Sequence, residues 1–418
     1  MMTTPEYTKP SLPEEAFQLG RKYQLGETFT RSKRLSKPAI KTAKSSPHRI
    51  SRRTLLAGIA VSGIAAIGIG GGIVWKQTGS QHFQSSVKRV SGASRKWVRN
   101  IGNGFAAPAV ANGIVYIESS DQKLYALDAI SGQIKWAYHV GGFLAMQASP
   151  VVANGLVYTG ADRSFCALDA ASGQLKWTFK AGGEIGTTSS TPTVANGLVY
   201  TGAEGHHLYA LDAASGQLKW TFKAGREIVP SSPKVANGLV YVGSEDHNLY
   251  ALDAVSGVMK WFYKAGDQVY TPMVANGTVY VGSENHNVYA LDAITGSKKW
   301  VYHSTIDDGI GRSTPTVANG VVYLCSNKGI VYALDAPSGN LLWSTQTDSS
   351  TLSDPTVADG IVYIGCYNHN LYALDAISGH VKWVYDIGSR IDSTPVVVDG
   401  VLYICSADKK LSAIQLPG

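Results

Sequence analysis

Short apolar runs separated by turn residues follow one another along residues 91–418. Residues 232–265 show the unit, with runs rich in Val, Tyr and Trp at 232–236, 239–244, 249–254 and 260–264. β-branched and aromatic residues suit a pleated, packed surface. Asn237-Gly238, between the first two runs, favours a two-residue hairpin because a type I′ turn needs positive φ at both positions. The pattern predicts four antiparallel strands. The same turn pair recurs at Asn112, Asn154, Asn196, Asn276 and Asn319, and it becomes Asp-Gly at Asp359 and Asp399.

A longer phrase, A-x-D-x-x-S/T-G-x-x-x-W, returns about every forty residues, from Ala126–Trp136 to Ala373–Trp383. A degenerate copy ends at Trp97. Four strands per forty residues are typical of a propeller blade. The V/L-Y pair that marks the second strand occurs eight times, which predicts an all-β, eight-bladed β-propeller. The last unit lacks a tryptophan strand, so we expect the Trp97 strand to complete it and close the ring.

The tryptophans are predicted to dock blade against blade. The alanine that opens the phrase is small, so we expect the ring of a neighbouring blade to lie on it. The aspartate is expected to accept backbone N–H bonds in the following turn. Stacking on a ligand is the alternative, and eight equivalent copies argue against it. The expected docking residues are Trp97, Trp136, Trp177, Trp220, Trp261, Trp300, Trp343 and Trp383.

The phrase resembles the tryptophan-docking motif of the quinoprotein-type, PQQ-like β-propeller repeats, over about residues 91–418. That resemblance implies two branches. Quinoprotein dehydrogenases hold PQQ and calcium on the axis. Non-catalytic propellers include the lipoprotein of the outer-membrane β-barrel assembly machinery, to which this chain is similar, and sensor parts of membrane proteins. The vicinal cysteine pair of many dehydrogenases is missing and no blade differs strongly, so we expect no catalytic residue, cofactor or metal.

Cysteines and histidines give no clear chemical site. The four cysteines, Cys166, Cys325, Cys366 and Cys405, stand in different repeats and fit no zinc spacing, so they are interpreted as small buried residues. Histidines recur in one hairpin and are interpreted as solvated turn residues. A local metal site at Glu204, His206 and His207 remains an alternative. The recurring histidines are His206, His207, His247, His286 and His369.

The net charge of +7 is concentrated at the N-terminus. Residues 1–53 hold twelve basic and four acidic residues, whereas the remainder has a net charge of −1. The propeller therefore offers no electrostatic reason for nucleic-acid binding. Leu55 to Val74 is uncharged and long enough to cross a bilayer. Arg52-Arg53 precedes it in a stretch that resembles a twin-arginine export motif; an ordinary signal anchor is the alternative.

These features predict four segments: a basic, disordered cytoplasmic tail (1–53), a transmembrane signal or anchor (54–75), a linker (76–90) and the propeller (91–418). The basic flank predicts a single-pass membrane protein with the N-terminus in the cytoplasm and the propeller outside.

Function is expected on the face built by the between-blade and second-hairpin loops, where the repeats diverge. Varying charges there suit a protein partner or a small ligand, although a solvated rim would carry them equally well. The expected function is an extracytoplasmic scaffold or ligand sensor, and the alternative is a PQQ/calcium-dependent dehydrogenase of alcohols or sugars. The candidate residues are Glu184, Arg226, Glu227, Asp267, Asp308, Arg312, Arg390 and Asp392.

Overall fold

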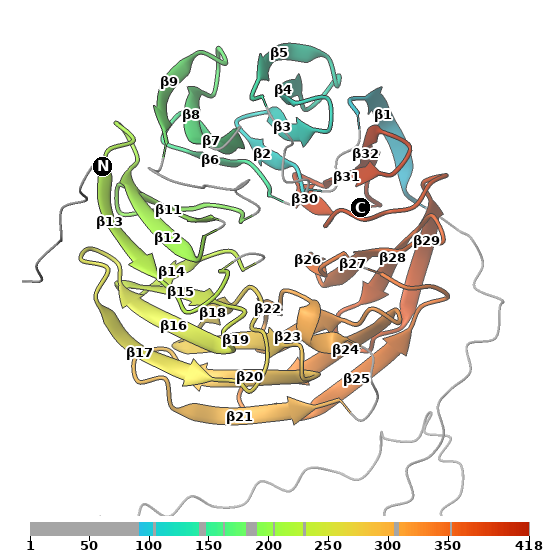
Figure 1. The fold of residues 1–418 in the computed structure, drawn as a ribbon. Coiled ribbons are helices and arrows are strands. Elements are labelled where there is room, and N and C mark those ends of the chain that lie inside the picture. The colour runs from blue at the N-terminus through green and yellow to red at the C-terminus, as the bar shows by residue number, and fades with distance from the viewer. Residues whose placement is uncertain are drawn as a thin grey trace, which may run out of the picture. The chain divides into compact units, whose positions relative to one another are not determined.

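The computed structural model describes residues 92–102, 106–141, 148–161, 164–180, 190–203, 205–228, 231–304, 309–351 and 353–417. Contacts divide the chain into two units, Met1–Thr78 and Gly79–Gly418. In the second unit, eight four-stranded antiparallel sheets follow one another around a common axis (Figure 1). The predicted all-β, eight-bladed propeller is confirmed.

Each blade runs from an innermost strand on the axis to an outermost strand at the rim. The innermost strands of blades 1–8 are β2 (Ala109–Ala111), β6 (Val151–Ala153), β10 (Thr193–Ala195), β14 (Lys234–Ala236), β18 (Met273–Ala275), β22 (Thr316–Ala318), β26 (Thr356–Ala358) and β30 (Val396–Val398). The second strands are β3 (Ile114–Ser119), β7 (Leu156–Ala161), β11 (Leu198–Ala203), β15 (Leu239–Gly243), β19 (Thr278–Ser283), β23 (Val321–Cys325), β27 (Ile361–Gly365) and β31 (Val401–Ser406).

The third strands are β4 (Lys123–Asp128), β8 (Ser164–Asp169), β12 (His207–Asp212), β16 (Asn248–Asp253), β20 (Asn287–Asp292), β24 (Ile330–Asp335), β28 (Asn370–Asp375) and β32 (Lys410–Gln415). The outermost strands of blades 1–7 are β5 (Ile134–His139), β9 (Leu175–Phe179), β13 (Leu218–Lys223), β17 (Met259–Lys264), β21 (Lys298–His303), β25 (Leu341–Gln346) and β29 (Val381–Asp386). A short 3-10 helix, η1 (Ile310–Arg312), lies between blades 5 and 6.

Blade 8 takes its outermost strand from the start of the propeller. Strand β1 (Ser94–Asn100) pairs antiparallel with β32, and Trp97 lies opposite Ala413. The sheet order β1-β32-β31-β30 joins the two ends of the domain. The innermost strands β2 and β30 also contact each other, so the ring is closed as predicted.

The two turns of the repeat have the predicted geometry. Asn237 and Gly238 adopt φ of 52° and 75°, which a type I′ turn requires. In the later turn, Asp253 Oδ1 accepts the backbone N–H of Ser256 at 2.9 Å. The geometry of both turns therefore depends on adjacent residues and not on contacts between blades.

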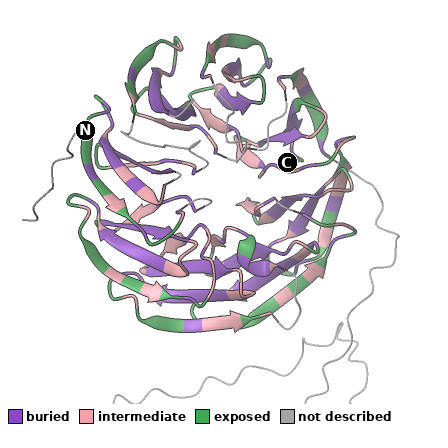
Figure 2. Ribbon diagram, in the orientation of Figure 1, coloured by how far each residue is buried: buried purple, intermediate pink, exposed green. Residues whose placement is uncertain are grey.

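Burial follows the position of a strand within its blade. The second and third strands are largely buried, because neighbouring blades cover both of their faces (Figure 2). Outermost strands are mixed, and many of their residues are exposed. Every residue of the eight innermost strands is half-buried, which is expected of strands that line a narrow axial space.

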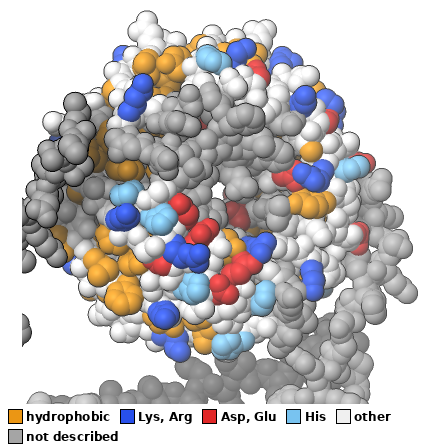
Figure 3. Space-filling view, viewed as in Figure 1, with side chains coloured by type: hydrophobic (Ala, Val, Ile, Leu, Met, Phe, Trp, Pro, Cys, Tyr) orange, Lys and Arg blue, Asp and Glu red, His pale blue; other side chains and the backbone are white. Residues whose placement is uncertain are grey.

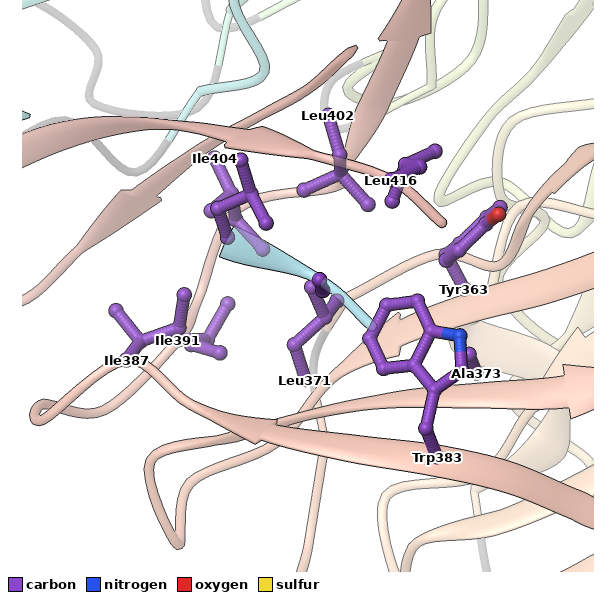
Figure 4. Close-up of a cluster of buried hydrophobic side chains, with 11 residues drawn as sticks. Tyr363, Leu371, Ala373, Trp383, Ile387, Ile391, Leu402, Ile404 and Leu416 are labelled. Atoms are coloured by element: carbon purple, nitrogen blue, oxygen red, sulfur yellow. The ribbon is translucent and has the colours of Figure 1, made fainter. Parts of the chain in front are cut away.

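The core consists of apolar layers between successive blades. Between blades 7 and 8, Trp383 of one blade and Leu402 of the next belong to one buried cluster (Figure 4). The four cysteines are free and buried, as expected. Burial raises the pKa of the Cys405 thiol to about 12, so it stays protonated near neutral pH.

The predicted membrane segment and export motif, with Arg52 and Arg53, lie outside the described residues. Within the described part of the chain, no helix is long and apolar enough to cross a membrane.

Candidate functional site

Seven of the eight tryptophans dock on the turn of the next blade. The Trp220 indole donates from Nε1 to the carbonyl oxygen of Ala254 at 3.1 Å. The Tyr200 hydroxyl of the same blade donates to that oxygen at 3.0 Å, so both lone pairs of the Ala254 carbonyl are used. The indole rests on Gly257, where an added Cβ would lie 2.6 Å from Trp220 Cδ2. The tryptophans thus lie between blades.

The same arrangement recurs around the ring. Within the described residues, indole N–H donors reach the next blade from Trp97, Trp136, Trp177, Trp220, Trp261, Trp300 and Trp343. Trp383 is buried in the layer between blades 7 and 8. The neighbouring indole meets the turn glycine, whereas the opening alanine Ala210 pairs with Trp220 of its own blade and belongs to a buried cluster that includes Tyr250 of the next blade. The hydrogen bond from the tyrosine hydroxyl to the carbonyl of the next blade was not predicted from the sequence.

Antiparallel strand order places the second hairpins and the between-blade loops on one face, here called the loop face. Charged and histidine side chains gather on the viewed face of the molecule, mainly over the blades in its lower half (Figure 3). Two of the predicted face residues, Glu184 and Asp308, lie outside the described residues.

Charged groups of the loop face are held by neighbours within the propeller. Glu227 Oε1 lies 3.3 Å from His206 Nε2 and accepts the N–H of Gly205 at 3.3 Å. Its other oxygen, Oε2, is buried and has no hydrogen-bond partner among the described residues. Arg226, directly before it, is exposed. Asp267 Oδ1, on the loop that leaves blade 4, is 4.0 Å from Nε2 of His247 in the same blade.

Arg312 is part of a tighter group. Its Nε lies 2.9 Å from both carboxylate oxygens of Glu284, and the Tyr270 hydroxyl donates to the same carboxylate. Burial raises the pKa of Glu284, but hydrogen bonds from Arg312 and Tyr270 outweigh it and hold the pKa below its usual value. Glu284 therefore remains ionised near neutral pH.

Arg390 and Asp392 pair with each other on the loop that enters blade 8. Arg390 Nη2 lies 2.9 Å from Asp392 Oδ2, and its guanidinium lies 4.8 Å from the centre of the Tyr367 ring. Asp392 Oδ1 is buried without a hydrogen-bond partner among the described residues. The structure thus leaves these predicted residues in separate groups.

The recurring histidines have a conformational explanation that sequence reasoning missed. His206, His247, His286 and His369 occupy equivalent hairpin positions with φ between 62° and 74°. Histidine, like Asn and Asp, is enriched in this left-handed region. Gly329 takes the same position in blade 6 with φ 77°. Glu204, one residue of the alternative metal site, lies outside the described residues. Among the described residues, no group of three side chains could hold a metal ion.

A belt of hydrogen bonds surrounds the axis where the chain enters the innermost strands. In five blades, the residue before the proline donates its backbone N–H to the side-chain oxygen of the equivalent residue in the next blade. Ser149 donates to Thr191 Oγ1, Thr191 to Ser232 Oγ, and Ser232 to Thr271 Oγ1, each at 3.0 Å. In blade 7 the acceptor is a carboxylate, since Thr314 donates to Asp354 Oδ1 at 2.8 Å.

Two charged residues at the axis were overlooked in the sequence. Lys234 begins β14 and is the one charged residue of the eight innermost strands. Burial lowers the pKa of Lys234 and raises the pKa of Asp354, and each charge opposes the shift of the other. Both keep some contact with solvent although protein surrounds them on most sides. The sequence contained a signal for both residues. Lys234 and Asp354 stand at repeat positions where the other repeats have Ala, Val, Met, Ser or Thr.

Glu118 is a further buried acidic residue, at a position where other repeats have Gly or Cys. It occupies the position of Gly160 or Gly202 in neighbouring blades, is 6% exposed, and accepts a hydrogen bond from Thr159 Oγ1 of blade 2. Burial raises the pKa of Glu118 to about 8, and the Thr159 bond only partly opposes this. The carboxyl group is therefore largely protonated at neutral pH.

The chain matches a known protein family. A family model described as "Outer membrane protein assembly factor BamB" matches residues 60–220, 231–324 and 304–417. Comparison with curated proteins gives no match.

Several solved structures share the fold. BamB from Moraxella catarrhalis aligns with a TM-score of 0.66 at 18% identity, covering 78% of this chain and 98% of that chain. The computationally designed Ika8 protein aligns with a TM-score of 0.65 at 15% identity, covering 76% and 98%. Quinohemoprotein alcohol dehydrogenase from Comamonas testosteroni aligns with a TM-score of 0.66 at 17% identity, covering 79% and 77%. At such identities the likeness concerns the fold alone.

Proposed function

The chain belongs to the outer membrane protein assembly factor BamB family, and we propose that it is a non-catalytic scaffold of the cell envelope. Its loop face would bind a protein partner or, in a sensor role, a small ligand. The observation that carries this proposal is the contrast between a uniform frame and a varied face. Docking contacts repeat from blade to blade, whereas the described charged groups of the loop face vary between blades.

The loop face is suited to a partner because its charges are fixed in place. Arg312 is held by Glu284, and Arg390 is held by Asp392 and by the Tyr367 ring. Ordered charges complementary to a partner favour specificity and association rate. Since Arg226, Arg312 and Arg390 are all exposed, we infer that basic groups supply much of the contact.

The proposed location is the membrane, with residues 1–53 in the cytoplasm and the propeller outside. It is supported by the +8 charge of that segment and by the uncharged span that follows. In this arrangement residues 76–90 connect the anchor to the propeller.

Fold likeness to quinohemoprotein alcohol dehydrogenases raises a second candidate, a PQQ/calcium enzyme. Calcium takes six to eight oxygen ligands. The described axial residues offer one carboxylate, Asp354, which already accepts the Thr314 N–H, and the ammonium of Lys234 would repel a cation. These residues do not fit calcium, so we derive no step through the cofactor. Adding PQQ and calcium to the purified protein tests this; alcohol-dependent dye reduction would overturn the scaffold proposal.

The scaffold proposal is tested by affinity capture of the tagged full-length protein from detergent-solubilised membranes of its own cells. Arg226→Glu combined with Arg390→Glu should release the partner that the unaltered protein retains. Lys219→Glu with Lys260→Glu is the matched control on the opposite face, where both lysines form exposed ion pairs of little energetic value. A partner retained by the loop-face variant and lost by the control would place the docking surface on the wrong face.

A further inference from the structure

We propose that the propeller axis holds a binding site for a small zwitterion, a molecule with one carboxylate and one ammonium group, such as a free amino acid. The site lies between Lys234 of blade 4 and Asp354 of blade 7. It is distinct from the ion pairs of the loop face and does not depend on the proposed protein partner.

Lys234 is the first residue of an innermost strand, β14, beside the axis. Threonines in the same position of blades 3, 6 and 7 donate their hydroxyl groups to the proline carbonyl of the next blade, at 2.5–2.7 Å. Lysine has no such short contact. Lys234 at the start of β14 and Asp354 just before β26 stand in blades 4 and 7 of a closed ring of eight, so the straight path between them crosses the axial space. Each charge opposes the pKa shift that burial causes in the other, in keeping with this placement.

The ammonium of Lys234 lacks a complementary group in the protein. Among the described residues, none accepts a hydrogen bond from it, and it forms no direct ion pair with Asp354. An enclosed charge without a partner is costly, as the lowered pKa of Lys234 reflects. A bound carboxylate would supply the missing acceptor through a charge-assisted hydrogen bond.

Further donors stand beside Lys234. The hydroxyl oxygens of Thr191, Ser232 and Thr271 each accept a backbone N–H from the preceding blade. A hydroxyl group that accepts in this way still has its own proton to donate. Within the described part of the chain, none of these protons is donated to another protein group. Blades 3 to 5 therefore offer three hydroxyl donors and one ammonium on the same side of the axis.

Asp354 provides the opposite recognition element. Its Oδ1 accepts the Thr314 N–H at 2.8 Å and lies 3.4 Å from Ser313 Oγ, which fixes the carboxylate. Because Lys234 and Asp354 together carry no net charge, a simple anion would leave Asp354 uncompensated and a dianion would be repelled by it. A zwitterion matches both groups, with its carboxylate on Lys234 and its ammonium on Asp354.

The test is calorimetric titration of the purified full-length protein with glycine, β-alanine and γ-aminobutyrate. These probes carry the same two charged groups at increasing separation. Propionate and propylamine, with one charged group each, are the controls. We expect saturable binding of at least one zwitterion, and binding of the controls weaker by about tenfold or more. No binding of any zwitterion, or equal binding of propionate, would overturn the proposal.

Two variants assign the site. Lys234→Met and Asp354→Thr use residues that this chain already has at the equivalent positions of other blades, Met273 and Thr314, so the fold should accept them. Each should weaken zwitterion binding about tenfold or more, whereas Lys219→Met on an outermost strand should not. Unchanged binding by either axial variant would refute the assignment. The single-charge probes test the site on the unaltered protein, so the outcome does not depend on the variants folding.

Discussion

The docking of Trp220 on Gly257 predicts that one turn glycine is far less replaceable than another. Gly257 and Gly238 belong to the same blade and have nearly equal φ, 72° and 75°. An added Cβ at Gly257 would lie 2.6 Å from Trp220 Cδ2 and 2.7 Å from Cε3, whereas at Gly238 it would meet no atom within 4 Å. Gly257→Ala and Gly238→Ala thus share the backbone strain and differ in the clash with the indole.

The expected magnitudes follow from these contacts. A left-handed conformation costs a non-glycine residue about 1–2 kcal/mol, which is the whole expected effect of Gly238→Ala. At Gly257 the ring must also move, at an overpacking cost of about 1–3 kcal/mol. Its displacement strains the 3.1 Å bond from Trp220 Nε1 to Ala254, worth about 1 kcal/mol. Gly257→Ala should therefore destabilise the protein by about 3–6 kcal/mol.

Urea unfolding of the purified protein, followed by circular dichroism, measures both changes as midpoint shifts. A double-mutant cycle separates the clash from the strain. In a Trp220→Ala background, Gly257→Ala should cost no more than Gly238→Ala, because the indole is gone. Equal midpoint shifts for the two glycine variants in the unaltered background would refute the docking argument.

Three further predictions concern closure, pH and export. Deleting residues 92–100 removes β1 from blade 8 and should lower the urea midpoint; equal stability of the truncated protein would contradict closure by that strand. Glu118 has a folded pKa of about 8 against an ordinary value of 4.5, so stability should fall as pH rises between these values, by up to about 5 kcal/mol. Glu118→Gln should remove that slope in urea titrations at pH 5 and pH 8, and an unchanged slope would count against the buried acid. Replacing Arg52-Arg53 by Lys-Lys should block export through a twin-arginine pathway, whereas a signal anchor should tolerate it; protease protection in spheroplasts distinguishes the two.

Much of the fold could be predicted from sequence because each blade is specified locally. Asn-Gly and Asp-x-x-Ser-Gly determine the turns through conformations that depend on adjacent residues, as Asn237 and Asp253 show. The missing tryptophan strand of the last unit also predicted the pairing of β1 with β32. These features need no knowledge of how one blade faces the next.

Contacts between blades were harder to predict. The sequence pointed to the alanine of the phrase as a contact for a neighbouring ring, but it did not indicate that Gly257 receives the Trp220 indole of the preceding blade. The Tyr200 hydroxyl shares the Ala254 carbonyl with Trp220, which strand periodicity does not reveal.

The axial residues were missed for a related reason. Lys234 and Asp354 are 120 positions apart in the chain, and only closure of the ring brings their charges across one space. An alignment of the eight repeats, searched for positions at which only one repeat has a charged residue, would have identified Lys234, Asp354 and Glu118. The candidate site residues were predicted from variation in the loops, whereas these three residues lie in or beside strands.

Photo-crosslinking in intact cells tests the central claim, a uniform frame that presents a partner-binding loop face, most directly. A photoreactive residue placed at Arg226 or Arg390 should crosslink the full-length protein to an envelope protein. The same residue at Asn196 or Asn237, exposed in Asn-Gly turns on the opposite face, should not. Crosslinks of equal yield from both faces, or from the Asn-Gly face alone, would contradict the account.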